Sequence, residues 1–166
     1  MWEKYVLFID GEAIVIDKPA GLAVHPGSAT RESLEDYLHH FRFGFQRAPL
    51  PVHRLDRDTS GCLLLARNQK AHKRFQRAFE DKKVAKTYVA VLDGVPGVEA
   101  GIVDMPLGKV STKEAGWRIV HDPEGKPSVT HWRTAAVKDG RAVIVFTPKT
   151  GRTHQIRVHA AAGIGI

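Results

Sequence analysis

The residues best suited to chemistry lie together in one short stretch, residues 52–60. It carries an imidazole, two guanidiniums and two carboxylates, on His53, Arg54, Asp56, Arg57 and Asp58. The apolar run 62–66 follows directly, and a short apolar run after a turn signal predicts a buried strand. Polar groups packed against a buried segment are costly unless they serve a site. A carboxylate held beside a rigid strand can act as a nucleophile or a proton acceptor, so this stretch is a candidate active site.

Two metal-dependent alternatives fit the pattern poorly. Asp56-x-Asp58-x-Ser60 nearly matches the motif of haloacid-dehalogenase phosphatases, which hold Mg²⁺ on both carboxylates. That chemistry needs an apolar strand before the first Asp, whereas here the strand follows, and Arg57 separates the two acids. A histidine metal site is disfavoured because His154 and His159 are five residues apart and no His-Glu-x-x-His occurs.

His53-Arg54-Leu55-Asp56, followed by Thr-Ser-Gly and an apolar strand, resembles the signature loop of the RluA-type RNA pseudouridine synthases. The resemblance implies that Asp56 is the catalytic residue. It also implies that Arg54 can fill the space left when a base is flipped out of the RNA. We refer to residues 52–60 as the signature loop.

Three further segments are similar to motifs of the same family, in family order. Residues 18–26, Lys-Pro-Ala-Gly-Leu-Ala-Val-His-Pro, resemble a first motif that packs beside the active site. Lys-Thr-Tyr at 86–88 resembles the tyrosine motif and assigns base contact to Tyr88. Residues 151–159 resemble a third motif, in which Arg157 would contact the catalytic Asp56. Without the resemblance, the first segment would be interpreted as a surface loop and Tyr88 as a half-buried strand residue.

The resemblance implies an isomerase that converts a specific uridine to pseudouridine in structured RNA, either rRNA or tRNA. It uses a catalytic aspartate and base flipping, and it needs no cofactor and no metal. The alternative that stays open is an RNA-binding module without catalysis. Replacing Asp56 with Asn discriminates the two, because only an enzyme should lose turnover.

Charge agrees with a polyanionic partner. The chain has a net charge of +7 and a pI near 9.7. Residues 68–83 predict an amphipathic helix with Asn68 as its N-cap, an apolar face that includes Ala71, Phe75 and Phe79, and a basic opposite face. We expect the following residues to contact RNA: Arg54, Arg57, Lys70, Lys73, Arg74, Arg77 and Arg152.

The remaining patterns predict strands at 5–9, 13–16, 86–92, 101–110, 117–121, 128–137 and 141–146, and helices at 33–43 and from Thr153 onward. Asp139-Gly140 is a hairpin signal between two of these strands. The family implies an α+β pseudouridine synthase fold, a largely antiparallel sheet with flanking helices and an active cleft across one face. The local patterns are compatible with that fold.

The length of 166 residues suits one catalytic domain over 1–166. We expect no small N-terminal RNA-binding domain of the kind many relatives carry, and a C-terminal end that is truncated. No run is long and apolar enough for a membrane span, and no signal peptide is evident. We therefore expect a cytoplasmic monomer with no obligatory protein partner. Cys62 is predicted to be a small buried hydrophobe.

Overall fold

The computed structural model describes residues 2–27, 30, 32–112 and 116–165. The chain forms two compact units, Met1–Lys83 and Val84–Ile166, and each is described by itself. The sequence predicts a single catalytic domain over 1–166. The residues predicted to act in that domain are divided between the two units.

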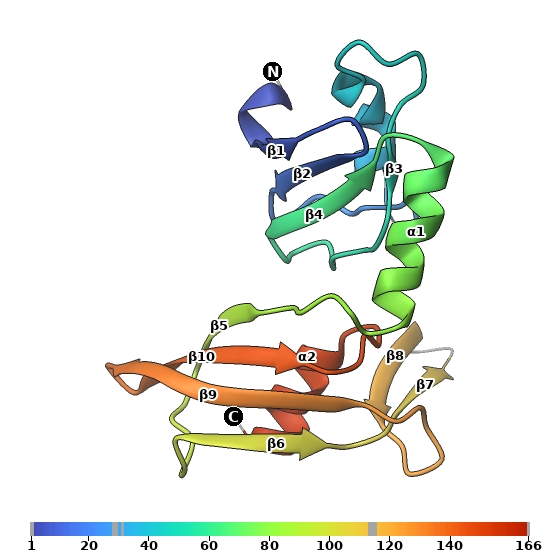
Figure 1. The fold of residues 1–166 in the computed structure, drawn as a ribbon. Helices are drawn as coiled ribbons and strands as arrows, with labels where there is room; N and C mark the ends of the chain where they lie inside the picture. The colour runs from blue at the N-terminus through green and yellow to red at the C-terminus, as the bar shows by residue number, and fades with distance from the viewer. Residues whose placement is uncertain (1, 28–29, 31, 113–115, 166) are drawn as a thin grey trace. The chain divides into compact units, whose positions relative to one another are not determined.

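The first unit is built on a four-stranded antiparallel sheet of order β1-β2-β4-β3 (Figure 1). Its strands are β1 (Val6–Ile9), β2 (Ala13–Lys18), β3 (Leu50–Pro51) and β4 (Gly61–Ala66). The two central strands pair along their whole length, and their side chains Ile14, Ile16, Leu63 and Leu65 are fully buried. The predicted strand after the signature loop is therefore confirmed as a core strand.

Three helices complete the first unit: η1 (Trp2–Tyr5), η2 (Leu34–Phe41) and α1 (Gln69–Glu80). The segment predicted as an amphipathic helix over 33–43 is the 3-10 helix η2, with Leu34, Leu38 and Phe41 buried as the spacing predicts. Helix α1 begins as expected, because the side chain of Asn68 accepts a 2.9 Å hydrogen bond from the Ala71 N–H. Its apolar face packs on Val52 and Ala66.

The second unit contains a four-stranded antiparallel sheet of order β5-β10-β9-β6. Its strands are β5 (Tyr88–Leu92), β6 (Ala100–Asp104), β9 (Val129–Lys138) and β10 (Arg141–Pro148). The predicted hairpin between β9 and β10 is confirmed, since Asp139 and Gly140 have φ of 51° and 76°, the positive values that a two-residue turn of this kind requires. A separate two-stranded ribbon consists of β7 (Leu107–Thr112) and β8 (Gly116–His121).

One face of this sheet is covered by α2 (Gln155–Val158) and the π-helical segment η3 (His159–Ile164) (Figure 1). Ala160 joins Val103, Trp132, Ile144 and Phe146 in the core between them, and Ile156 and Ile164 pack against it. The α+β class with antiparallel strands is thus confirmed. The strands are divided between two four-stranded sheets and a ribbon, whereas the sequence predicted one sheet.

Three local predictions are wrong. Residues 101–110 are two strands, because the chain breaks at Met105-Pro106 and β6 and β7 then join different sheets. The N-cap of α2 is His154 and Thr153 precedes it. Cys62 is exposed, because strand alternation directs it away from the core that buries Leu63.

Among the described residues, no helix combines the length and the apolar character that crossing a bilayer would require.

The Asn68 cap can be tested by its effect on stability. Asn68→Ala leaves the Ala71 N–H without its partner and should lower the free energy of unfolding by about 1 kcal/mol. Asn68→Asp keeps an acceptor at the N-cap and should stay close to wild type. Urea denaturation followed by circular dichroism measures both, and equal stability of the Ala and Asp variants would contradict the assigned cap.

Candidate active site

The signature loop is fixed at its entry by main-chain and imidazole contacts to β4. The Val52 N–H donates to the Leu64 carbonyl at 3.0 Å. Nε2 of His53 accepts the Leu64 N–H at 3.1 Å, and the ring stacks on Phe79 of α1 with centroids 4.5 Å apart. A nitrogen that accepts a hydrogen bond carries no proton, so the neutral ring is protonated at Nδ1. His53 therefore has a structural role, joining the loop to both β4 and α1.

The loop then makes a tight turn that carries the candidate catalytic carboxylate. Leu55, the residue before Asp56, has a buried side chain that anchors the turn. The Thr59 N–H donates to the Asp56 carbonyl at 3.1 Å and closes the turn. Asp56 is half-buried, while Arg57 and Asp58 are exposed and pair with each other at 3.1 Å. The turn thus leaves Asp56 partly shielded and Asp58 in solvent.

A fully buried lysine holds this turn in place. Lys18, the last residue of β2, has 0% exposure. Its Nζ donates to the carbonyls of Pro19 and Leu22 at 2.7 Å and to that of Arg57 at 3.1 Å. The Arg57 carbonyl also accepts the Gly21 N–H at 2.9 Å. We call the Lys18 ammonium with its three carbonyl partners the lysine clamp; it joins the first motif to the signature loop.

The clamp also places a buried charge near the two acids of the turn. Burial lowers the pKa of Lys18 from the ordinary lysine value, and the nearby carboxylates of Asp58 and Asp56 act in the opposite direction. Three carbonyl acceptors satisfy all three N–H donors of an ammonium, which makes a buried lysine tolerable.

Helix α1 presents its basic face to solvent, as the sequence predicts. Lys70, Lys73 and Arg77 are exposed. Arg74 has an intramolecular partner, since its two terminal nitrogens contact the carboxylate of Glu12 at 3.2 and 2.6 Å. Arg54 and Arg57, on the loop, are exposed as well.

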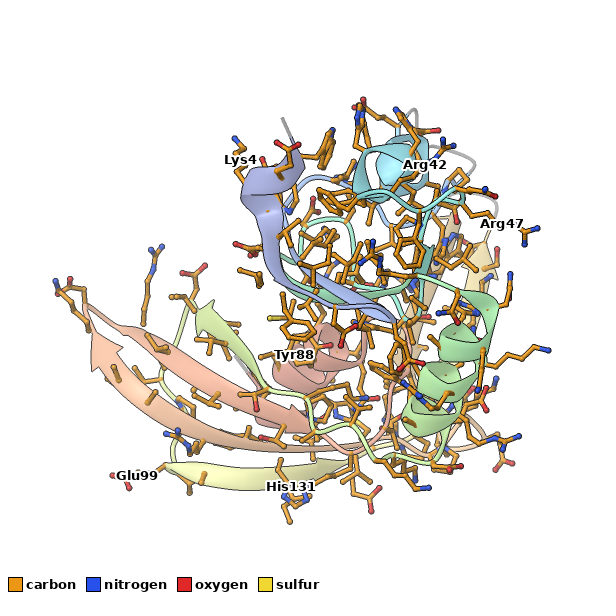
Figure 2. The ribbon with its side chains drawn as sticks, turned by 45° about the horizontal axis from the view of Figure 1, so that its top comes forward. Lys4, Arg42, Arg47, Tyr88, Glu99 and His131 are labelled. Atoms are coloured by element: carbon orange, nitrogen blue, oxygen red, sulfur yellow. The ribbon has the colours of Figure 1, made fainter. Side chains whose placement is uncertain are left out.

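Tyr88, labelled in Figure 2, is the first residue of β5 and lies opposite Phe146 of β10. It is half-buried and packs against the core of the second unit. Two residues earlier, Nζ of Lys86 lies 3.5 Å from the Thr150 carbonyl, and burial lowers the pKa of Lys86. The tyrosine motif is therefore in contact with the residue that directly precedes the third motif.

The third motif is held by a buried amide. Oε1 of Gln155 accepts from the Thr150 hydroxyl at 2.8 Å and from the Arg152 N–H at 3.0 Å. Its Nε2 donates to the Val129 carbonyl at 3.1 Å and to Oγ1 of Thr130 at 2.9 Å. The side chain thus uses all four of its hydrogen-bonding positions and attaches the start of α2 to β9.

A buried histidine continues this network one turn later. Nδ1 of His159 lies 2.9 Å from Oγ1 of Thr130, and Nε2 lies 3.1 Å from the Met105 carbonyl. A carbonyl only accepts, so Nε2 carries the proton and Nδ1 accepts from the Thr130 hydroxyl. Burial is the main reason that the pKa of His159 is lowered. Gln155 and His159 share the inner face of the helix, and Arg157 between them is exposed.

The predicted site residues fall into two groups. Asp56 lies in the first unit with Arg54, Arg57 and the basic face of α1, and Tyr88, Arg152 and Arg157 lie in the second. Sequence reasoning gave Lys18 only a supporting role and missed its burial. It also missed the inward-facing Gln155 and His159, although their i, i+4 spacing on a predicted helix was a usable signal.

Within the described part of the chain, no three His, Cys, Asp or Glu side chains gather as a metal ion would require.

Comparison with known families shows which family carries these motifs. A family model described as RNA pseudouridylate synthase matches residues 12–162, which include the lysine clamp, the signature loop and the third motif. The chain belongs to the RNA pseudouridylate synthase family. The RluA-type resemblance of the sequence is thereby confirmed.

Relatives within the family support this membership. An uncharacterized RNA pseudouridine synthase of Zymomonas mobilis is 57% identical over 98% of this chain and 74% of its own length. Ribosomal large subunit pseudouridine synthase D of the same organism is 35% identical over 95% of this chain. The solved structure of human RNA pseudouridylate synthase domain containing 4 superposes with a TM-score of 0.82 at 26% identity, over 98% of this chain and 66% of that one. The chain spans 51% of the length of the ribosomal synthase D.

The lysine clamp predicts a large and local stability effect. Lys18→Met should cost at least about 2 kcal/mol of unfolding free energy, because buried carbonyls lose their donors. Lys4→Met, the same change at an exposed position, should shift stability by less than about 0.5 kcal/mol. Urea denaturation of the two variants compares them, and equal stability would show that the clamp contributes nothing.

Burial of His159 predicts a pH dependence of stability. The lowered pKa means that the unfolded state takes up a proton first as pH falls below about 6.5. Stability from this group is complete above that pH and is lost below it, by at most about 1.4 kcal/mol per pH unit, until His159 itself is protonated. His159→Gln should flatten this slope in urea denaturation, whereas His39→Gln at an exposed site should not. An unchanged slope in the His159 variant would be inconsistent with a buried neutral imidazole.

Proposed function

We propose that this chain converts uridine to pseudouridine at a defined site in structured RNA, either rRNA or tRNA. The proposal depends mainly on the structure of the signature loop. Asp56 is half-buried in a turn that its own carbonyl closes by accepting the Thr59 N–H, and the lysine clamp holds that turn. Family membership supports the reaction. Relatives named as ribosomal large subunit pseudouridine synthases favour rRNA as the substrate class.

The reaction breaks the bond between ribose C1′ and uracil N1 and forms a bond between C1′ and C5. The base then loses its C5 proton and gains one at N1, so substrate and product are isomers and no electrons are exchanged with a redox partner. An ionised Asp56 can serve either by attacking as a nucleophile or by accepting a proton from the sugar. A rigid turn suits both roles, because either requires the carboxylate within about 3 Å of the reacting atom.

Two residues of the second unit have proposed roles in the same reaction. Arg157 is exposed on α2, and its guanidinium stays charged and can grip a carboxylate through two hydrogen bonds. We assign it to keep Asp56 ionised. Tyr88 offers an aromatic face to the uracil and a hydroxyl that can handle the C5 proton.

The RNA must present the target base outside its stack, at a cost of a few kcal/mol. Phosphate contacts offset this cost, and the exposed cations Lys70, Lys73 and Arg77 of α1 suit that role. Arg57 and Arg152 are exposed as well and extend the set. Arg54 is proposed to fill the space that the base vacates. Arg74 contributes less, because it is already paired with Glu12.

Replacing the catalytic carboxylate tests the proposal. Asp56→Asn should reduce pseudouridine formation by at least about 100-fold, because an amide is neither a nucleophile nor a base. The variant should bind RNA at least as tightly as wild type, because it removes a negative charge. Nucleoside analysis of digested RNA and a filter-binding assay measure the two quantities.

Asp58→Asn is the matched control, because Asp58 is an exposed acid two residues away. It should retain activity. A wild-type chain that binds RNA and forms no pseudouridine would favour the RNA-binding module instead.

A further inference from the structure

An aromatic pair, an exposed tryptophan and a half-buried histidine, lies where the β7–β8 ribbon meets the third motif. Trp117 of β8 is 48% exposed. Its ring stacks on that of His154, with centroids 5.4 Å apart and planes at 15°. Nζ of Lys109, on the neighbouring strand, lies 4.9 Å from the centre of the Trp117 ring. All three residues belong to the second unit.

The histidine of this pair has a backbone conformation that few residues other than glycine adopt. His154 is the N-cap of α2 and has φ 53° and ψ 20°, in the left-handed region. A residue other than glycine in such a conformation costs of order 1 kcal/mol, and it persists where its surroundings hold it, often at binding sites. His154 lies between Arg152 and Arg157, both exposed. The strained turn therefore carries an aromatic residue that is flanked in the sequence by two exposed cations.

The ribbon itself has the charge that a nucleic acid requires. Strands β7 and β8 contain Lys109 and Arg118 and no acidic residue. The acid that follows β8, Asp122, is engaged in its own turn, where it accepts the Glu124 N–H at 3.1 Å. Trp117 is not part of the main core of this unit, which is formed by other side chains, including Trp132 and Phe146.

We propose that Trp117 and His154 form a stacking site for an unpaired base of the RNA substrate, with Lys109 and Arg152 on its flanking phosphates. This inference rests on the proposed function and adds a second recognition site outside the target uridine. Proteins that bind single-stranded or looped RNA stack bases on aromatic side chains and follow the backbone with cations. The site would favour an RNA in which an unpaired base accompanies the modified uridine.

Tryptophan fluorescence reports directly on this stacking. The chain contains Trp2, Trp117 and Trp132, and the last is buried at 7% exposure. A short single-stranded RNA should quench the wild-type emission, and a duplex containing the same strand should quench it less. Trp117→Phe should remove most of the quenching, because it removes the reporting indole. If single-stranded RNA binds without quenching, or quenches the Phe variant equally, the proposal is overturned.

Affinity provides the second readout. Trp117→Leu retains an apolar contact with α2 and loses the stacking surface, so its dissociation constant for single-stranded RNA should rise roughly 5- to 150-fold. Lys109→Met should lower the slope of log affinity against log salt by about 0.7. Unchanged affinity in the Leu variant would contradict the site. Far-UV circular dichroism confirms that each variant is folded.

The Asp56→Asn protein separates this inference from the proposed function. It should show the full quenching with no turnover. Quenching in a wild-type chain that forms no pseudouridine would support the stacking site and contradict the proposed reaction. Normal turnover with unchanged KM in Trp117→Leu would contradict the stacking site and leave the proposed reaction supported.

Discussion

The buried ammonium of Lys18 is the interaction on which the candidate site depends. Burying a lysine ammonium is costly unless each of its N–H groups makes a hydrogen bond. Here the carbonyls of Pro19, Leu22 and Arg57 accept all three. Two of these carbonyls belong to the first motif and one to the signature loop. The same side chain therefore fixes the shape of a proline- and glycine-rich segment and the position of the turn that carries Asp56. This coupling joins two loops that contain little regular secondary structure of their own.

The second unit uses a neutral version of the same principle. Gln155 and His159 are buried beneath α2 and η3, and both bind Thr130 of β9. Every polar atom in this group has a partner, so the helix has one defined rotation against the sheet. That rotation leaves Arg157 exposed. In each unit, then, satisfied buried polar groups hold a residue with a proposed role, the half-buried Asp56 in the first unit and the exposed Arg157 in the second.

The sequence predicted the elements with strong local signals. Apolar periodicity identified the core strand after the signature loop and the buried face of α1, and Asp139-Gly140 identified the hairpin turn. Signals that depend on tertiary context were not readable: Cys62 looked like a core residue until pairing set the alternation of β4, and the break at Met105-Pro106 was hidden in an apolar run. The burial of Lys18 could not be predicted, because a lysine after a strand is usually exposed. The family resemblance predicted roles for individual residues that composition and periodicity alone could not predict. It did not predict the contacts of Trp117.

We propose that the clamped loop carries the catalytic residue of a carbon–carbon bond-forming isomerisation on RNA. The most direct measurement uses rRNA and tRNA transcripts tritiated at uracil C5 and follows release of tritium to water by the purified chain. Forming the new bond at C5 displaces that hydrogen, so the account predicts release of one tritium for each pseudouridine formed, from a single position in one RNA class. If the folded protein binds the RNA but the RNA keeps its tritium and contains no pseudouridine after incubation, the account is contradicted.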